Sequence, residues 1–246
     1  MERAQLAETA EGARLDAERE SLRNTLLASI SHDLRTPLSV IAGAGSALAQ
    51  HGSALDEQTR VNLARSVETK AREMSELVSN VLDLMRFESG HIVLRRDWQT
   101  LDDLVGAALV NLESKLAGHS VELRIPADLP PVHVDATLIV QVFSNLFDNI
   151  AKYTPPGTRV YVTAMVDGIF VRVLVEDEGP GLPVGNPERL FDKFQRGNDE
   201  GTVVGVGLGL AICQAIIRAH GGEIEAHRRE GGGARFELTL PAEEPL

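Results

Sequence analysis

The sequence has a single cysteine, Cys213, among its 246 residues. One thiol excludes an internal disulfide and fits a reducing compartment. A long hydrophobic run is also missing: residues 37–55 carry no formally charged side chain, but glycine, alanine, serine, glutamine and His51 distinguish them from a membrane span. Met1–Arg3 leads into a charged helical pattern, so no signal peptide is visible. We therefore expect a soluble stretch of chain.

Basic residues are fewer than acidic residues. The 24 lysines and arginines face 36 acidic residues, which gives a net charge of −12 and a pI near 5.0. Because nucleic-acid binding requires a basic surface, this balance argues against direct nucleic-acid partners. The length allows one large domain or two modest ones.

The N-terminal part is rich in strong helix formers, and residues 1 to about 50 are predicted to form one long helix. Within it lies the octapeptide 31–38. His32 and Thr36 are four residues apart and share one flank of the helix. A neutral imidazole is a competent nucleophile near neutral pH, and an adjacent acid can hold its tautomer. Asp33 is the candidate orienting group and base.

A second helix is predicted from about residue 56 to 88, with an apolar stripe that includes Val61, Val78 and Met85. Two helices with such broad apolar faces cannot form a full core alone. Pairing with a second copy into a four-helix bundle would close it. A solitary hairpin leaning on the rest of the chain is the alternative. The break at Ser89-Gly90 separates a first domain, 1–90, from a second, 91–246.

The second domain alternates strand-like and helix-like segments. The predicted strands are 92–96, 121–125, 132–134, 160–166, 169–176, 223–227 and 235–240, and the predicted helices are 101–116, 135–153 and 208–220. Helices with a largely antiparallel sheet predict a two-layer α/β sandwich. The whole chain is therefore α+β, a helical hairpin followed by this sandwich.

Polar residues form a stripe on the helix 135–153. Asn145, Asn149 and Lys152 stand at i, i+4 and i+7, either as a solvated face or as a ligand site. The run 205–210, Gly-Val-Gly-Leu-Gly-Leu, leads straight into a helix and suits an anion. It lacks the Lys-Ser/Thr of a P-loop and the spacing of a dinucleotide site. The glycine-rich loop of about 179–206 is predicted to be a lid.

Several of these stretches resemble the boxes of bacterial sensor histidine kinases. Residues 31–38 resemble the phospho-acceptor box, and residues 145–153, 176–182, 190–197 and 231–236 resemble the boxes of the ATP site. The resemblance implies an ATP-binding domain of the histidine kinase, gyrase and Hsp90 type behind a dimeric bundle. It also implies that His32 takes the γ-phosphoryl of ATP and passes it to an aspartate on the receiver domain of a response regulator.

The resemblance assigns roles to individual residues. Asn149 ligates Mg²⁺, Lys152 meets phosphate, Tyr153 flanks adenine, and Asp177 accepts the exocyclic amine of adenine. The rest of the implied ATP-binding set is Asn145, Gly179, Gly181, Leu182, Lys193, Phe194, Arg196, Gly205, Val206, Gly207, Leu208 and Gly209. Arg196 is a candidate phosphate partner. The residue matching Thr36 positions water when such kinases dephosphorylate their regulator.

Two positions depart from the family pattern: Ile150 stands where alanine is usual, and Ala234 replaces a common serine or threonine. The opening 23–28, the Ser-His-Asp variant and the run 205–213 resemble the KdpD-type subfamily, which controls a high-affinity potassium transport operon. This implies the cytoplasmic portion of an inner-membrane protein, working as a homodimer, whose sensory segments lie outside this sequence.

Two other functions remain open at this point. One is a related-fold ATPase of the gyrase, chaperone and mismatch-repair group. Such an enzyme carries a glutamate four residues before the metal-binding asparagine, where this chain has Asn145. The other is a degenerate dimeric scaffold without kinase activity.

Overall fold

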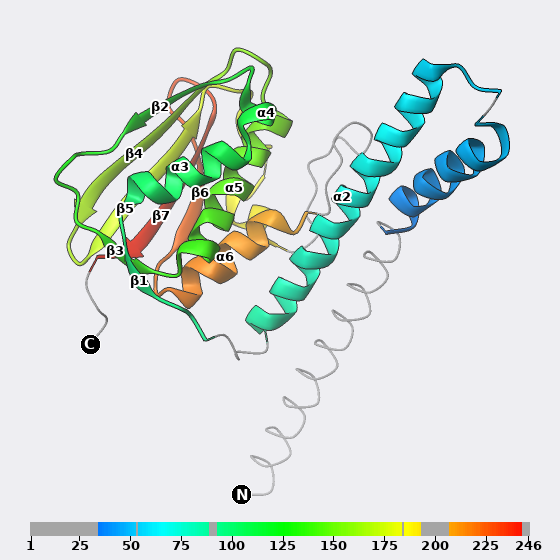
Figure 1. Cartoon of the computed structure of the whole chain (residues 1–246). Coiled ribbons are helices and arrows are strands. Elements are labelled where there is room, and N and C mark those ends of the chain that lie inside the picture. Colours follow the sequence, from blue (N-terminus) through cyan, green and yellow to red (C-terminus); the bar gives the residue numbers. More distant parts are fainter. Residues whose placement is uncertain (1–33, 53, 89–92, 184, 193–206, 243–246) are drawn as a thin grey trace, which may run out of the picture. The chain divides into compact units, whose positions relative to one another are not determined.

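The computed structural model describes residues 34–52, 54–88, 93–183, 185–192 and 207–242 (Figure 1). The chain divides into two compact units, Met1–Ser79 and Asn80–Leu246. Within the described ranges, no helix has both the length and the apolar character needed to cross a membrane.

The first unit is a helical hairpin. A helix over residues 34–51 is followed by a turn and by α2 (Glu57–Glu88), which continues into the second unit. Asp56 caps α2: its Oδ1 accepts the N–H of Thr59 at 2.8 Å. Among the described residues of this unit, the buried apolar side chains are Ala44 and Leu77. One copy of the hairpin therefore leaves most of its apolar surface uncovered.

The second unit is built on a five-stranded sheet of order β2-β4-β5-β7-β6. Its strands are β2 (Ser120–Arg124), β4 (Arg159–Asp167), β5 (Phe170–Asp177), β6 (Ile224–Arg228) and β7 (Ala234–Pro241). Strands β2 and β4 are parallel and every other pair is antiparallel. The predicted largely antiparallel sheet is confirmed. A separate antiparallel ribbon joins β1 (Asp97–Gln99) to β3 (Val132–Val134).

Three helices lie against one face of this sheet: α3 (Leu101–Asn111), α5 (Ala136–Tyr153) and α6 (Gly209–Ala219) (Figure 1). Buried and half-buried residues alternate along β5 and β7. This pattern is expected where a sheet packs one face on a core and leaves the other to solvent. The predicted two-layer α/β sandwich is thus confirmed.

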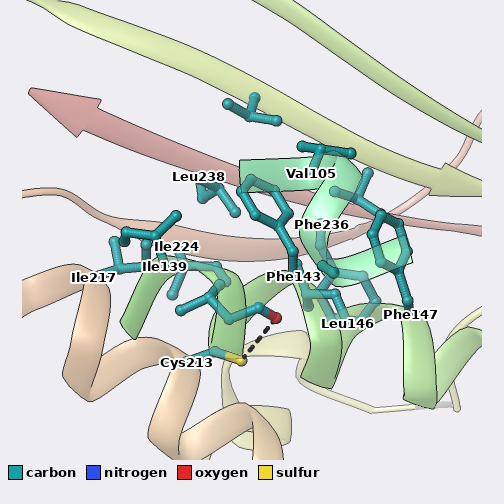
Figure 2. Close-up of a cluster of buried hydrophobic side chains, with 14 of the residues drawn as sticks. Val105, Ile139, Phe143, Leu146, Phe147, Cys213, Ile217, Ile224, Phe236 and Leu238 are labelled. Carbon is teal, nitrogen blue, oxygen red and sulfur yellow. Dashed lines mark hydrogen bonds between the residues drawn. The ribbon is translucent and has the colours of Figure 1, made fainter. Parts of the chain in front are cut away.

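The core between the layers is dominated by the apolar arc of α5. Phe143 and Phe147 are fully buried, with ring centroids 6.4 Å apart, and both point from α5 toward the strands (Figure 2). On the other flank of α5, the Sγ of Cys213 in α6 lies 3.7 Å from the carbonyl oxygen of Val142. Burial raises the pKa of the Cys213 thiol to about 12, so it is an inert packing group.

Three local expectations differ from the structure. The strand predicted at 92–96 is wrong: residues 93–96 form no strand, and the strand that pairs with β3 is β1, just beyond them. The helix predicted at 101–116 is interrupted at Leu112, which separates α3 from the short α4 (Glu113–Leu116). Within the glycine-rich loop predicted to be a lid, Pro187–Phe191 form a 3-10 helix, η1, capped by Asn186.

Candidate functional site

The polar stripe of α5 lies outside the buried arc of that helix. Asn145 and Asn149 are half-buried, and Lys152 and Tyr153 are exposed. The amide of Asn145 donates from Nδ2 to the carbonyl oxygen of Gly209 at 3.4 Å. This contact joins the stripe to the start of α6. Because Asn145 is an amide with this partner, it cannot act as the base that a water-activating ATPase requires.

Lys152 is held by a carboxylate that the sequence analysis did not single out. Its Nζ lies 2.5 Å from Oδ2 of Asp148, and Nζ of Lys115 lies 2.6 Å from Oδ1. Burial alone would raise the pKa of Asp148, but the two ammonium groups outweigh it and the pKa is lowered. A phosphate at Lys152 would therefore compete with an ionised carboxylate.

Asp177 ends β5 and is almost completely buried. Its Oδ1 accepts two backbone N–H groups, from Gly179 at 2.8 Å and from Ala234 at 3.3 Å. Burial raises the pKa of Asp177, and these two hydrogen bonds act in the opposite direction without cancelling that effect. The two N–H groups fix the orientation of the carboxyl group, and among the described residues Oδ2 has no hydrogen-bond partner.

Two glycines allow the chain to close around Asp177. A Cβ on Gly179 would lie 2.5 Å from Cγ2 of Thr154, just beyond the end of α5. Gly233 has a φ of 101°, and a Cβ there would lie 1.8 Å from the carbonyl oxygen of Asp177. These close approaches bring the end of α5, the loop after β5 and the start of β7 to one place.

His119 borders the same place and was missed from the sequence. The hydroxyl of Thr154 donates to the carbonyl oxygen of Ile150 at 2.7 Å, so Nε2 of His119, 2.9 Å from that hydroxyl, is the donor to it. The other ring nitrogen, Nδ1, is buried without a hydrogen-bond partner. His119 and Thr154 are 35 residues apart, so no local pattern could have paired them.

The start of α6 faces Asn145. Gly207 has a φ of 68°, Leu208 is buried, and α6 begins at Gly209. Leu208 occupies the N-cap position without a side-chain hydrogen bond to the helix. The first N–H groups of α6 are thus left to other acceptors, as an anion site requires.

Seven of the predicted site residues lie outside the described residues. They are His32, Asp33, Lys193, Phe194, Arg196, Gly205 and Val206. Thr36 is described, and it is exposed on the first helix. Gly181 and Leu182 follow Gly179; a Cβ on Gly181 would lie 3.0 Å from the carbonyl oxygen of Gly233, and Leu182 packs on the core.

Two family models match this chain side by side. The model of the His Kinase A (phospho-acceptor) domain matches residues 22–90. The model of the histidine kinase-, DNA gyrase B- and HSP90-like ATPase matches residues 134–244. The chain belongs to the sensor histidine kinases. Its second unit is accordingly an ATP-binding domain of that type.

Individual histidine kinases are similar over most of the chain. The sensor protein KdpD of Escherichia coli K12 is 43% identical over 245 residues, which are 98% of this chain and 27% of the relative. The chain thus spans about a quarter of the length of that kinase. The sequence motifs also resembled the KdpD-type subfamily. The histidine kinase AdeS of Acinetobacter baumannii is 27% identical, with a TM-score of 0.68 over 87% of this chain and 98% of AdeS.

A third similar kinase is ThkA, solved in complex with the response regulator TrrA. It is 27% identical, with a TM-score of 0.70 over 92% of this chain and 64% of that chain. With AdeS, it supports the predicted architecture of a helical hairpin before an α/β sandwich.

The described residues contain no cluster of three or more His, Cys, Asp or Glu that could hold a metal alone. Mg²⁺ does not require such a cage, because it retains waters and is bound by few protein oxygens together with phosphates. The half-buried amide of Asn149 on the polar stripe fits that kind of site.

The geometry of Asp177 generates a prediction. The change Asp177→Asn keeps one oxygen for the two backbone N–H groups but can turn an NH₂ donor toward the adenine amine. We expect ATP affinity to fall by roughly 10- to 10²-fold, since an unpaired polar group costs about 1–3 kcal/mol. Calorimetry on Asp177→Asn and on Glu178→Gln, an exposed neighbouring acid, provides the matched comparison. Equal affinities in the two variants would reject Asp177 as the adenine acceptor.

Proposed function

We propose that this chain is the phosphoryl-transfer core of a two-component sensor. It binds Mg·ATP in its second unit, passes the γ-phosphoryl to His32, and donates it from there to an aspartate of a response regulator receiver domain. The observation that carries the proposal is the convergence of three family boxes, 145–153, 176–182 and 231–236, with Gly209 of the glycine-rich run 205–210. Asn145 meets Gly209, the Thr154 methyl lies against Gly179, and Asp177 binds Ala234, although these residues come from distant parts of the sequence.

The adenine end of the proposed pocket is built on Asp177. Its Oδ1 is fixed by two backbone N–H groups, so Oδ2 is the oxygen we assign to the exocyclic amine. Tyr153 flanks the base. At the phosphate end we place the first N–H groups of α6, Lys152 and, from the lid, Lys193 and Arg196.

Asn149 is the residue we assign to Mg²⁺. Mg²⁺ held there would supply positive charge at the phosphates during the transfer. The chain's own part is to supply the amide oxygen from a helix whose rotation is fixed by its buried face. The α6 N–H groups then orient the phosphates toward the acceptor.

The transfer forms a bond between an imidazole nitrogen of His32 and the γ-phosphorus. The bond from that phosphorus to the bridging oxygen breaks, and ADP leaves with the electron pair. We assign to Asp33 the orientation of the imidazole tautomer and the removal of its proton. We place the boundary between the phospho-acceptor domain and the catalytic domain near Gly90.

The hairpin unit supports a homodimer. Val61 and Val78 on α2 are 38% and 43% exposed in a single copy, as are other apolar residues along the helix. Monomeric proteins rarely leave such a stripe in water, and a second hairpin would complete a four-helix bundle. ThkA, which is similar over 92% of this chain, forms a complex with a response regulator, and that supports the same class of partner here.

The similarity to KdpD supports our proposal that this core serves potassium-responsive regulation. KdpD of Escherichia coli is about four times as long as the matched region. We therefore assign signal reception and any membrane attachment to segments outside this sequence.

Two variants test this proposal: one removes the acceptor histidine, and the other removes the proposed metal ligand of the nucleotide site. His32→Gln should abolish labelling by γ-labelled ATP yet leave nucleotide affinity nearly unchanged. Asn149→Ala should lose Mg²⁺-dependent affinity by at least roughly tenfold, because a protein ligand of the metal is removed. His51→Gln and Asn111→Ala, at exposed positions, are the matched controls. Label that persists on His32→Gln would exclude His32 as the acceptor, and unchanged Mg·ATP affinity in Asn149→Ala would exclude the metal role.

A second activity is proposed for Thr36, one turn after His32. Its exposed hydroxyl can hold a water for dephosphorylation of the regulator. Thr36→Ala should leave phosphorylation of His32 largely unchanged and slow dephosphorylation by about 10²-fold, the low end for a positioning group. Both rates are measured on one preparation beside Thr69→Ala, an exposed threonine of α2. Equal losses in the two rates would mean that Thr36 only supports the helix.

A further inference from the structure

His220 is a completely buried histidine outside the predicted site. It occupies the C-cap position of α6. Its Nε2 lies 3.0 Å from the backbone nitrogen of Asp135, and its Nδ1 lies 2.8 Å from the carbonyl oxygen of Ile216. A backbone N–H can only donate and a carbonyl can only accept. The ring is therefore neutral, with its hydrogen on Nδ1.

The bond to Asp135 joins the ends of two helices. Asp135 is the N-cap of α5, where its Oδ1 accepts the N–H of Leu138 at 3.3 Å. Its Oδ2 accepts the N–H of Arg95 at 3.0 Å. His220 thus joins the C-cap of α6 to the N-cap of α5.

The nucleotide site lies at the opposite end of the same helix pair. Asn145 of α5 contacts Gly209 at the start of α6, and Cys213 contacts Val142 between the two ends. From one contact to the next, the residue number rises along α5 and falls along α6, so the two helices pack antiparallel. A helix of 11 residues is about 16 Å long. A change of tilt at His220 would therefore displace Gly209 against Asn145.

Two charged groups bear on His220. Arg96 donates from Nη2 to the carbonyl oxygen of Ala219 at 2.9 Å, beside the ring, and Asp135 supplies a carboxylate. Burial is the largest effect and lowers the pKa of His220. The bond to Ile216 is the next largest effect and raises the pKa; the smaller effect of Arg96 lowers it and that of Asp135 raises it. The neutral form is thus favoured in the folded chain at neutral pH.

We propose that neutral His220 is a positioning residue. It holds α5 and α6 in the relative placement that nucleotide binding requires, and protonation of its ring releases the two helices from that placement. The inference rests on the proposed function, since it assigns ATP to this helix pair. A proton on Nε2 would face the Asp135 N–H, donor against donor, and the bond would open. Because the folded pKa lies below the ordinary value, the support is complete above about pH 6.5 and is lost as the pH falls through the lower folded pKa.

Two substitutions separate the two bonds of the ring. Glutamine can place an acceptor near the Nε2 position and keep the bond to Asp135. Asparagine can place a donor near the Nδ1 position and keep the bond to Ile216 within α6. At about pH 7.5, His220→Gln should bind a non-hydrolysable ATP analogue with Mg²⁺ within roughly threefold of the wild type. His220→Asn should bind roughly tenfold more weakly, as loss of one hydrogen bond implies.

The pH profile supplies a readout that a merely structural cap would not change. The dissociation constant of the full chain is measured from about pH 7.5 to about pH 5, across the ordinary pKa of histidine. Protonation of the nucleotide affects every variant alike. The wild type should lose more affinity than His220→Gln over this range, and His227→Gln, an exposed histidine of β6, should follow the wild type.

Each outcome decides the inference. Equal affinities in His220→Gln and His220→Asn, or equal acid losses in His220→Gln and the wild type, would overturn it. If His220→Asn does not fold, the comparison of the two pH profiles decides; if His220→Gln does not fold, the inference fails. A wild-type chain that binds no nucleotide at neutral pH would contradict the proposed function as well, whereas normal binding with identical variants would contradict this inference alone.

Discussion

The burial of one arc of α5 is the constraint on which the rest of the second unit depends. Ile139, Phe143, Leu146 and Phe147 are fully buried between the helices and the sheet. An α-helix repeats every 3.6 residues, so fixing this arc also fixes the direction of every other side chain on the helix. As a consequence, Asn145 and Asn149 lie outside the buried arc, and the packing of that arc fixes the rotation of the helix that carries them.

The neighbouring elements then complete a site around that helix. Strand β5 ends in Asp177 next to the start of β7, because the two strands pair antiparallel and Glu176 faces Arg235. Helix α6 returns antiparallel to α5 and presents its first turn to Asn145. The groups that we propose to bind adenine and phosphate are thereby placed on helices and strands of the sandwich.

Local patterns in the sequence predict most helices and strands, whereas contacts between residues far apart in the sequence leave no local pattern. The spacing of apolar residues predicted α5 and α6, and the strand-like runs 160–166 and 169–176 predicted β4 and β5. The run 92–96 has strand propensity, but β3 pairs with Asp97–Gln99 instead, so tertiary pairing overrode propensity. The contacts of His119 with Thr154, Lys115 with Asp148 and His220 with Asp135 link residues 33 to 85 positions apart. Such contacts depend on how the layers pack, which no local spacing encodes.

The central claim is that this chain transfers the γ-phosphoryl of ATP to its own histidine. The most direct measurement incubates the wild-type chain with Mg²⁺ and ATP labelled at the γ-phosphate, denatures it, and treats equal portions with acid and with alkali. A phosphohistidine predicts covalent label that is lost in acid and retained in alkali. A chain that binds ATP but carries no label, or whose label survives acid, would contradict the account.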